Sequence, residues 1–471
     1  MRLKTALVPI LSLAISPLMA KNPRPNFIFI LADDLGWTAT SSPIDNRIPE
    51  SRSDFYETPN LDRLGNQGIR FSNGYAPASI CTPSRRSIQF GQTPLRLGDV
   101  TFAENYNPKT KEWLTIPRML KSIDPAYKTA HYGKWDLRAN IFPEDLGYDE
   151  SDGDTGNING DVMFEKTDKF TAHFTNNDPK RIETITKRAL SFVKRQTEAG
   201  NPFYLQLSHY ATHVDIQSKE KTFLKFDQKE KGKIHDSPGW AGMLYDLDAG
   251  IGKVLDLVEK LGIGDNTYII FMADNGAVEF LPPVSNRLDP PSTFSKQMIN
   301  FPLRGGKWTL YEGGTRVPFI IRGPGIKPGQ YCHVPVTGFD LMPTLADLAG
   351  DRKPLPEYLD GGSLRPVLKD PAGGKVHRAH TELFFHRYTD AYPHSSILDG
   401  NFKLIRFLKT KKIELYDLSI DLGEVNDLAA KMADKVKLMG DKLDNYLKEV
   451  NSEVLRSDLP KSKKKKDNDE D

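Results

Sequence analysis

Nearly continuous apolar runs that end in polar residues recur along this 471-residue chain. They are NFIFILADD (26–34), PFYLQLSHYATH (202–213), NTYIIFMADNG (266–276) and RVPFIIRGPG (316–325), the last of which is closed by a turn. Such runs are typical of strands that are buried on both faces of a parallel sheet. The pattern therefore predicts a sheet whose strands carry polar side chains at their carboxyl ends.

Segments with a helical spacing of apolar residues lie between the predicted strands. One covers 182–200 and ends at a glycine, and another covers 243–262, where Gly262 fits the position just after a helix. In the second segment five apolar residues share one face: Leu244, Leu247, Ile251, Leu255 and Val258. This alternation predicts an α/β fold with a large, mostly parallel sheet sandwiched by helices. Ligands bind beyond the carboxyl ends of the strands in such sheets.

The pattern changes from about residue 376. The segment SSILDGNFKLIRFLKTKKIELYDLS (395–419) predicts strands joined by tight turns, the first at Asp399-Gly400, and a long amphipathic helix is predicted over 429–450. We therefore divide the chain into a catalytic α/β domain (21–375), a smaller C-terminal α+β subdomain (376–455) and a charged tail (456–471) that we expect to be disordered.

The first twenty residues have the pattern of an export signal, with Arg2 and Lys4 followed by a short apolar stretch that ends near Ala20. That stretch is too short to span a bilayer, and we expect no membrane span elsewhere. We therefore expect a periplasmic or secreted protein, although an ordinary amphipathic first helix is the alternative. The formal net charge of +2 gives no overall field that would favour nucleic acid as a partner.

Four oxygen donors stand at two predicted strand ends: Asp33, Asp34, Asp274 and Asn275. Carboxylate and amide oxygens suit Ca²⁺ or Mg²⁺ better than Zn²⁺, which prefers nitrogen and sulfur ligands. A solvated turn or a tight turn is the alternative for each pair taken alone. Two acidic strand ends on one edge of a sheet favour a metal site.

Cys81 is one of only two cysteines and lies in ASICTPSRRSIQFG (78–91), where a loop is expected to become a helix. Pro83 suits the first turn of that helix, and Arg85 follows one turn after Cys81. The free N–H groups and the dipole of a helix N-terminus favour negative charge, so a reactive thiolate is one interpretation. A buried thiol and a disulfide with Cys332 are the alternatives.

The string CTPSRRSIQFG resembles the signature of the type I sulfatases, the formylglycine-dependent branch of the alkaline phosphatase superfamily. Further segments resemble that family in the same order, from residue 26 to about residue 430: NFIFILADDLGW, YGKWDL, SHYATH, ADNG, LRGGKWTLYEGGTRVPFII and IELYDLSIDLGEVNDLA. The resemblance implies a hydrolase of sulfate monoesters. It also implies that Cys81 is oxidised to formylglycine by a partner, either a formylglycine-generating or an anaerobic sulfatase-maturing enzyme.

The resemblance further implies roles for individual residues. One Ca²⁺ per chain would be bound by Asp33, Asp34, Asp274, Asn275 and residue 81. The hydrated formylglycine would attack sulfur, and its second hydroxyl would then expel sulfate and restore the aldehyde. The implied catalytic residues are Cys81, Arg85, Lys134, Asp136, His213 and Lys307, with His213 protonating the departing alcohol. The implied substrate-binding residues are Lys134, His213, Lys307, Trp308 and Arg304.

One position departs from the family pattern, because Asp136 stands where the family usually has a histidine after Lys-Trp. That histidine contacts the formylglycine hydrate and helps the sulfated intermediate to collapse. We interpret Asp136 as a replacement proton acceptor, or expect another histidine, His131 or His209, to fill the space. An impaired enzyme is the third alternative.

Export favours a sulfated polysaccharide or oligosaccharide as the substrate, and thus a role in polysaccharide degradation. Two other functions fit the same residues. A formylglycine-dependent phosphodiesterase or phosphonate hydrolase would share the nucleophile and the metal. A catalytically impaired protein that binds sulfated glycans would share the fold and would explain Asp136.

Overall fold

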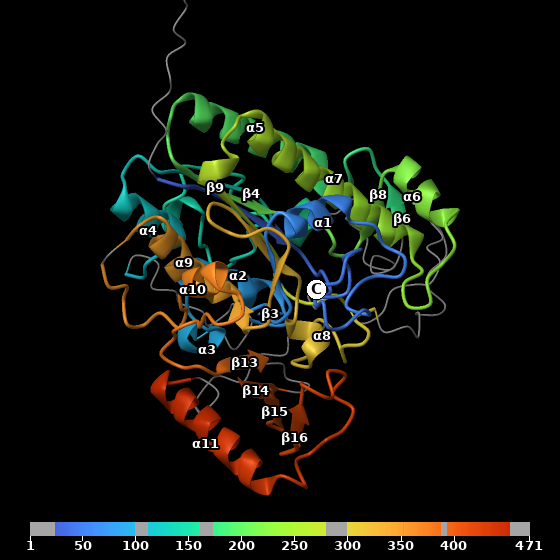
Figure 1. The fold of residues 1–471 in the computed structure, drawn as a ribbon, viewed down its shortest axis with the longest axis vertical. Helices are drawn as coiled ribbons and strands as arrows, with labels where there is room; N and C mark the ends of the chain where they lie inside the picture. Colours follow the sequence, from blue (N-terminus) through green and yellow to red (C-terminus); the bar gives the residue numbers. More distant parts are fainter. Residues whose placement is uncertain are drawn as a thin grey trace, which may run out of the picture.

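The computed structural model describes residues 24–98, 112–160, 173–278, 299–351, 353–387 and 393–452. Within these residues the central feature is an eight-stranded sheet (Figure 1). Its strands, in spatial order, are β11 (Gln330–Cys332), β2 (Ile69–Phe71), β10 (Phe319–Arg322), β9 (Thr267–Ala273), β1 (Asn26–Ala32), β7 (Phe203–Ser208), β4 (Lys128–Gly133) and β5 (Glu150–Ser151).

The pairing of these strands confirms the predicted fold class. The described neighbours pair in parallel except where β10 lies between β2 and β9, and β10 is antiparallel to both. The apolar runs at 26–34, 202–213 and 266–276 form β1, β7 and β9, and the residues of these strands are buried. Burial on both faces explains why the runs lack the alternation of a half-exposed strand.

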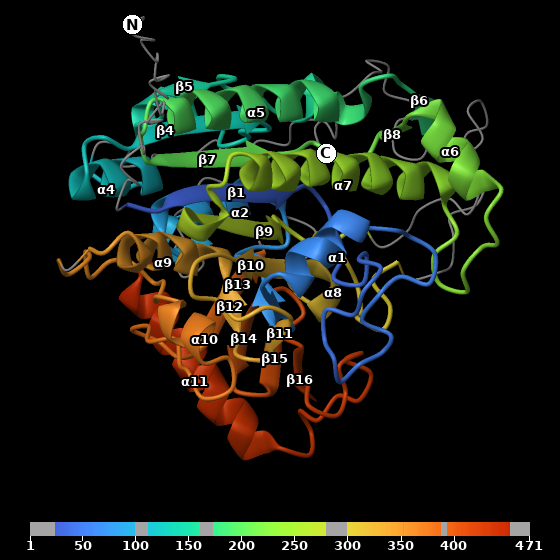
Figure 2. The same ribbon diagram turned by 45° about the horizontal axis from the view of Figure 1, so that its top comes forward.

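Helices cover both faces of the sheet (Figure 2). On one face, α1 (Pro59–Asn66) and α5 (Ile182–Glu198) pack with α7 (Pro238–Lys260), whose predicted apolar face is buried. The other face carries α2 (Cys81–Phe90), α4 (Ile116–Ile123), α9 (Leu341–Leu348) and α10 (Arg365–Lys369). As predicted, α7 is followed by Gly262, whose positive φ of 65° suits the residue after a helix end.

Shorter elements connect these layers. The short helices are α3 (Pro94–Leu97), α6 (Glu220–Asp227) and α8 (Glu312–Thr315). Two small parallel pairs join β3 (Gly74–Tyr75) to β12 (Val336–Thr337) and β6 (His173–Thr175) to β8 (Ile216–Ser218). The 3₁₀ turns are η1 (Glu144–Leu146), η2 (Asn157–Asn159), η3 (Pro179–Arg181), η4 (Gly264–Asn266) and η5 (Gly338–Asp340).

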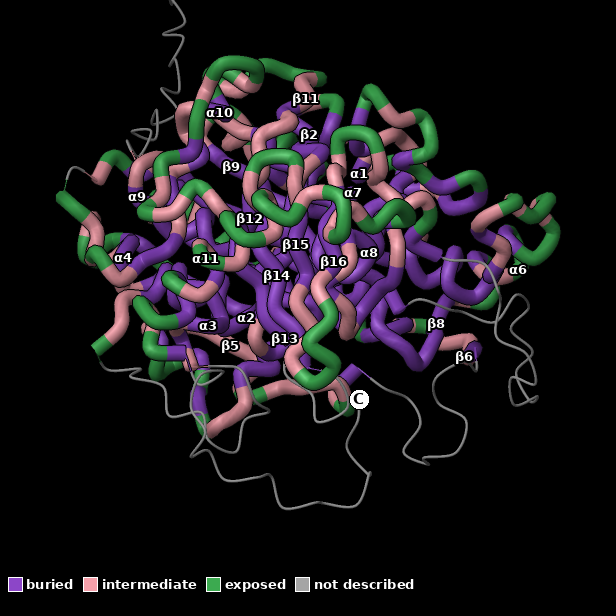
Figure 3. The backbone as a smooth tube through the Cα atoms, turned by 90° about the horizontal axis from the view of Figure 1, so that it is seen from below, coloured by how far each residue is buried: buried purple, intermediate pink, exposed green. Residues whose placement is uncertain are grey.

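A separate antiparallel sheet forms the C-terminal part of the chain. Its order is β13 (Leu383–Arg387), β14 (His394–Asp399), β15 (Phe402–Phe407) and β16 (Ile413–Asp417), and α11 (Ala433–Glu449) packs against β14 and β15. The turn predicted at Asp399-Gly400 joins β14 to β15, and much of both strands is buried (Figure 3). The boundary placed at residue 376 stays a prediction.

Two predictions concern residues outside the described ranges, namely the export signal at 1–20 and the charged tail at 456–471. Among the helices that the structure describes, we find none with the length and apolarity that a bilayer crossing requires.

Candidate active site

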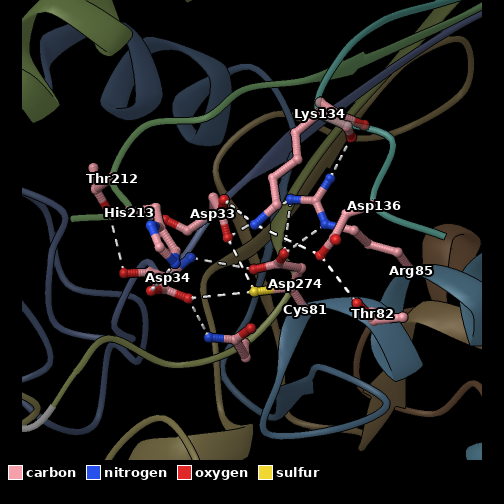
Figure 4. Close-up of polar contacts among 12 residues, drawn as sticks. Asp33, Asp34, Cys81, Thr82, Arg85, Lys134, Asp136, Thr212, His213 and Asp274 are labelled. Carbon is pink, nitrogen blue, oxygen red and sulfur yellow. Dashed lines mark hydrogen bonds and ion pairs between the residues drawn. The ribbon is translucent and has the colours of Figure 1, made fainter. Parts of the chain in front are cut away.

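Four adjacent parallel strands bring the predicted site residues to one edge of the sheet. β9, β1, β7 and β4 lie side by side, so their carboxyl ends meet at the same edge. Asp33 and Asp34 follow β1, Asp274 follows β9, Lys134 follows β4, and the segment after β7 carries His213. Their side chains converge on one cluster (Figure 4).

The N-terminus of α2 adds Cys81 and Arg85 to this cluster. As predicted, α2 begins at Cys81, whose Sγ donates a weak hydrogen bond to Asp33 Oδ1 at 3.4 Å. Arg85 Nε donates to Asp274 Oδ2 at 2.8 Å. Both cysteines are free and buried, so the disulfide between Cys81 and Cys332 that the sequence left open is wrong.

Two buried lysines pair with the aspartates that follow β1. Lys134 Nζ lies 2.6 Å from Asp33 Oδ2, and Lys307 Nζ lies 2.9 Å from Asp34 Oδ2. Gly133 precedes Lys134 with a φ of 97°, and a Cβ there would lie 2.0 Å from the last carbonyl oxygen of β7. Glycine is therefore required for β4 to approach β7 closely enough to direct Lys134 into the cluster.

The donors at this edge fit one hard cation. Ligand atoms of Asp33, Asp34, Cys81 and Asp274 all lie within 4.8 Å of one another. Asn275 Nδ2 donates to Asp34 Oδ1 at 2.6 Å, whereas Asn275 Oδ1 is buried and has no hydrogen-bond partner within the described ranges. Atoms at this spacing can reach a single Ca²⁺ with metal–oxygen distances of about 2.3–2.6 Å. The unpartnered amide oxygen could serve as a further ligand for the same ion.

His213 borders the cluster on the side of Asp34. Its Nε2 lies 3.7 Å from Asp34 Oδ2 and makes no hydrogen bond within the described part of the chain, while Nδ1 contacts the carbonyl oxygen of Val214. The neighbouring Thr212 was missed in the sequence. Its Oγ1 donates to the carbonyl oxygens of Asp33 and Asp34, each at 3.1 Å, and so ties the histidine segment to the metal segment.

Comparison with known proteins assigns the chain to a family. A family model described as Sulfatase matches residues 25–351, and one described as N-sulphoglucosamine sulphohydrolase, C-terminal, matches residues 306–453. The chain belongs to the sulfatase family. It is therefore a sulfuric ester hydrolase, as the resemblance of its motifs implied.

Individual relatives cover most of this sulfatase. A protein named Sulfatase from Formosa agariphila is 28% identical over 91% of this chain and 90% of its own length. N-acetylgalactosamine-6-sulfatase from Rattus norvegicus is 31% identical over 78% of this chain and 70% of its own. The crystal structure of Ps i-CgsB in complex with k-i-k-neocarrahexaose matches with a TM-score of 0.71 at 25% identity, covering 90% of this chain and 93% of that one.

Burial and neighbouring charges shift the pKa values of the sulfatase's three central carboxyls. Burial raises the pKa of Asp34, and it raises the pKa of Asp274 to about 7 with help from the negative charge of Asp33. Burial acts on Asp33 in the same sense, but the charges of Lys134 and its neighbours lower the pKa of Asp33 below its ordinary range. The cluster therefore holds more closely spaced carboxyls than can all ionise easily without a further cation.

Burial disfavours the charged forms of Cys81 and His213, the two groups that would act on the reacting ester. Burial raises the pKa of the Cys81 thiol well above its ordinary value, so the reactive thiolate considered from the sequence is disfavoured. Burial also lowers the pKa of His213, and the positive charge of Lys307 lowers it further.

Asp136 lies at the edge of the cluster with its carboxylate held by three neighbours. Thr82 Oγ1 donates to Asp136 Oδ2 at 3.1 Å, Arg138 Nε donates to Oδ1 at 3.2 Å, and Lys134 Nζ lies 3.8 Å from Oδ2. Burial alone would raise the pKa of Asp136, but the charges of Lys134 and Arg138 lower it. Asp136 therefore carries its negative charge at neutral pH. Thr82 and Arg138 were not singled out in the sequence.

The two histidines considered as substitutes are both buried, and burial lowers the pKa of each. His131 Nε2 lies 3.0 Å from Ser208 Oγ, and burial together with the charge of Arg85 lowers the pKa of His131 to about 3. Burial lowers the pKa of His209 to about 4, and the backbone N–H of His209 donates to the carbonyl oxygen of Leu31.

Trp308 and Arg304, which were also predicted to bind substrate, lie in different surroundings. Trp308 lies beside the cluster, with its ring centroid 5.2 Å from Lys307 Nζ. Arg304 instead points to the C-terminal part of the chain, where its Nη1 donates to Tyr416 Oη at 3.0 Å and to the carbonyl oxygen of Glu424 at 2.8 Å.

Proposed function

We propose that this sulfatase is an exported enzyme that hydrolyses a sulfate ester on a saccharide, with formylglycine at position 81 and one bound Ca²⁺. The observation that carries the proposal is the single buried cluster in which Cys81 meets three aspartates, two lysines and His213. The relatives support the substrate class, because one is named for a sulfated amino sugar and another was crystallised with k-i-k-neocarrahexaose.

The metal and the modified residue have defined places in this proposal. Ca²⁺ would be held by Asp33, Asp34, Asp274, Asn275 and residue 81, and it would offset negative charge as sulfate is transferred. Formylglycine at position 81 would supply, as its hydrate, the hydroxyl that attacks sulfur. A maturing enzyme would have to install it, since no cysteine side chain carries an aldehyde.

Lys134 and Lys307 bind the sulfate oxygens. Burial would lower the pKa values of both amines, but the adjacent aspartates raise them, so both lysines stay charged at neutral pH. Each amine already lies within 3 Å of a carboxylate of the metal cluster. A sulfate group between the two lysines would therefore lie against the metal ligands and residue 81.

His213 acts as the general acid for the departing alcohol. Its Nε2 faces the cluster and, although buried, makes no hydrogen bond within the described ranges, so this atom lacks a partner that a substrate oxygen would supply. A bound sulfate ester adds negative charge beside the ring and opposes the lowering of the pKa of His213. Proton donation to the leaving oxygen typically contributes about 10²–10⁴-fold to the rate.

Asp136 accepts the proton that residue 81 must lose when sulfate is released. The carboxylate is ionised, and Oδ2 faces Thr82, the residue next to position 81 in α2. Its negative charge would repel sulfate, but the adjacent Lys134 and Arg138 offset that repulsion. The alternative of an impaired, glycan-binding protein predicts binding of the same substrates without turnover.

A panel of defined sulfated oligosaccharides tests the proposal. Protein is produced in a host that installs formylglycine, position 81 is checked by peptide mass spectrometry, and released sulfate is measured by ion chromatography. We expect sulfate release from at least one saccharide, and none from Cys81→Ala. Hydrolysis of phosphate diesters or phosphonates in preference to every sulfate ester would overturn the proposal, and so would full activity with an unmodified thiol.

A further inference from the structure

We propose that Trp308 is the surface on which the sugar ring that carries the scissile sulfate stacks, so that this side chain makes the enzyme selective for cyclic sugar sulfates over acyclic ones. The inference rests on the proposed function, because it names how that same site recognises the alcohol part of the ester. It concerns Trp308, which makes no polar contact with the metal ligands in the described structure.

One lysine side chain places the indole next to the charged cluster. Lys307 Nζ lies 2.9 Å from Asp34 Oδ2 and 5.2 Å from the centroid of the Trp308 ring. An amine that binds a sulfate oxygen therefore lies within contact range of the face of an aromatic ring. The atoms joined to that sulfate through the ester oxygen can therefore reach the same ring.

Burial divides the site into a charged interior and an aromatic border. Lys134, Lys307, Cys81 and His213 are exposed by only 0%, 3%, 4% and 6%. Trp308 is half-buried, and it packs against the main hydrophobic core with its remaining surface open. The anionic part of a substrate belongs among the buried charges, which leaves the uncharged sugar at the indole.

The chemistry of the indole suits the apolar face of a sugar ring. A pyranose presents a face of C–H bonds that water solvates poorly, and a tryptophan side chain offers a large, rigid apolar surface with few rotatable bonds. An acyclic alkyl sulfate has the same charged group but no such face. Trp308 can therefore distinguish two esters that the buried lysines and His213 cannot.

The backbone holds Trp308 in a conformation that a large side chain rarely adopts. Its φ is 73°, in the left-handed region that favours glycine. The Trp308 N–H donates to the carbonyl oxygen of Ser79, two residues before Cys81, and the Lys307 N–H donates to the carbonyl oxygen of Ala277, both at 2.9 Å. The loop is thus fastened to both the nucleophile segment and the metal segment. Strain of this kind persists where the surrounding structure enforces it, and it gathers at functional sites.

The test compares substitutions of Trp308 with a matched control elsewhere. Trp308→Phe keeps a smaller aromatic face, and Trp308→Leu keeps apolar bulk without one. Trp113→Leu is the control, because Trp113 is also half-buried but packs edge-on against Phe90 at a ring distance of 5.3 Å, at the other end of α2. Melting temperature and bound calcium are measured for each variant to confirm that the fold and the metal site are intact.

Turnover gives the first readout. For a sulfated saccharide that the wild type hydrolyses, we expect Trp308→Leu to raise KM about tenfold with kcat changed little. The KM of Trp308→Phe should lie between those of the wild type and Trp308→Leu. For ethyl sulfate, kcat/KM should change less than about twofold, because its alcohol part offers no ring to stack. Trp113→Leu should leave both substrates unaffected. Equal losses on the two substrates, or an unchanged KM for the saccharide, would overturn the role of Trp308.

Binding gives a readout that does not depend on turnover. With Cys81→Ser protein, saturation-transfer NMR of a sulfated disaccharide should show the strongest transfer at the C–H protons of one ring face, and Trp308→Leu should remove that preference. Inorganic sulfate should still bind within about twofold of its wild-type affinity, since the lysines are intact. If no saccharide is hydrolysed but this pattern appears, the proposed catalysis fails and the role of Trp308 stands. Binding that is identical in Trp308→Leu contradicts the role of Trp308 whatever the activity.

Discussion

Two buried clusters of charged side chains can be compared in this sulfatase, and their oxygens are satisfied in different ways. One is the catalytic cluster around Cys81. The other, which we call the joint cluster, lies where the main unit meets the C-terminal sheet and consists of Tyr75, Glu312, Arg316, Lys403 and Glu424. All five side chains are buried, and neither cluster is exposed enough for water to screen its charges.

Each carboxylate oxygen of the joint cluster lies within 3.2 Å of a cation or a hydrogen-bond donor, although Glu424 Oε1 shares Lys403 with Glu312 and makes no hydrogen bond within the described residues. Glu312 Oε1 lies 2.9 Å from Lys403 Nζ, and Oε2 accepts from Tyr75 at 2.9 Å and from Arg316 at 3.2 Å. Glu424 Oε1 lies 3.1 Å from Lys403 Nζ, and Oε2 accepts the Glu312 backbone N–H at 2.7 Å. The two carboxylates of the joint cluster are therefore balanced by two cations, Arg316 and Lys403.

The catalytic cluster differs in how its polar atoms are arranged. Oxygen and sulfur ligand atoms of four residues face one another within 4.8 Å, and Asn275 Oδ1 and His213 Nε2 have no hydrogen-bond partner within the described residues. Unsatisfied buried atoms cost free energy, so they persist where a ligand supplies the missing partner. Buried charge alone therefore does not mark a functional site, and what distinguishes the catalytic cluster is the convergence of ligand atoms from four residues within 4.8 Å.

Loss of the nucleophile should give the largest effect. Cys81→Ala removes the side chain that we propose is converted to formylglycine, so we expect kcat to fall by at least on the order of 10⁴-fold. The melting temperature should change little, because the side chain contributes only weak sulfur hydrogen bonds to Asp33 and Asp34. Sulfate release by ion chromatography and thermal unfolding check the two statements. Substantial residual activity in Cys81→Ala would place the nucleophile elsewhere.

Asp136→Asn should cause the next largest loss of activity. Asparagine keeps the shape and can still accept the hydrogen bond from Thr82, but it cannot take a proton, so kcat should fall about 10²–10⁴-fold. Alcohol should still be released in the first turnover, which rapid-quench measurements would detect.

Asp154→Asn is the matched control, since Asp154 is an exposed carboxyl whose pKa is raised by partial burial and by the charge of Asp136. Its kcat should stay at the wild-type value. An unchanged kcat in Asp136→Asn would show that Asp136 is not the acceptor, and His131 or His209 would then be substituted in turn.

In the joint cluster the same kind of change should affect stability. Lys403→Met leaves Glu312 and Glu424 buried without their shared cation, and breaking such a pair typically costs about 3–5 kcal/mol. Urea denaturation would measure the loss in the free energy of unfolding. Lys437→Ala is the control, because Lys437 pairs with Asp441 on the exposed surface of α11 and should leave stability unchanged. A stable Lys403→Met protein would show that the joint cluster is not needed to fasten the C-terminal sheet.

Asp274→Asn should have the smallest and most diagnostic effect on stability. Because burial and the charge of Asp33 raise the pKa of Asp274 to about 7, the folded, calcium-free protein binds a proton that the unfolded chain has lost above about pH 4. The contribution of Asp274 to the stability of the calcium-free wild type should therefore fall as the pH rises from about 4 to about 7, by on the order of 1 kcal/mol or more. The buried histidines, whose pKa values are lowered, contribute in the opposite sense, so Asp274→Asn is needed to isolate this contribution.

Calcium-free Asp274→Asn should lack that pH dependence and be at least as stable as the wild type at pH 8, although it should bind calcium poorly and be inactive. Thermal unfolding with a chelator at pH 5 and pH 8 makes the measurement. If the stability of the calcium-free wild type relative to Asp274→Asn does not fall over this range, the picture of crowded carboxyls is refuted.

The parts of the fold that could be predicted from sequence are those set by local patterns. β1, β7 and β9 are buried on both faces, so their apolar runs identify them without knowledge of the neighbours. The polar residues at the ends of these strands could therefore be identified as candidate site residues. The antiparallel orientation of β10 could not be read, because it depends on pairing with β2 and β9 rather than on its own residues.

The rest of the site depends on contacts between distant segments. Asp136, which accepts the hydrogen bond from Thr82, has a φ of 50°. The sequence around Asp136 does not predict this backbone conformation. The link from Glu312 to Lys403 joins residues 91 positions apart. Arg304 was expected to bind substrate because it shares a motif with Lys307, but its guanidinium contacts the C-terminal part of the chain, and its role at the substrate stays a prediction.

The loop from Arg304 to Glu312 bears on how sulfatases can be recombined. It carries Lys307 and Trp308, yet it is built against the C-terminal part of the chain through Tyr416, Glu424 and Lys403. A chimera with its crossover at residue 376 would separate this loop from the surface that shapes it. A crossover placed before Arg304 would transfer the loop together with the C-terminal residues that contact it. A segment exchanged to alter substrate choice would therefore have to cross the boundary between the two sheets.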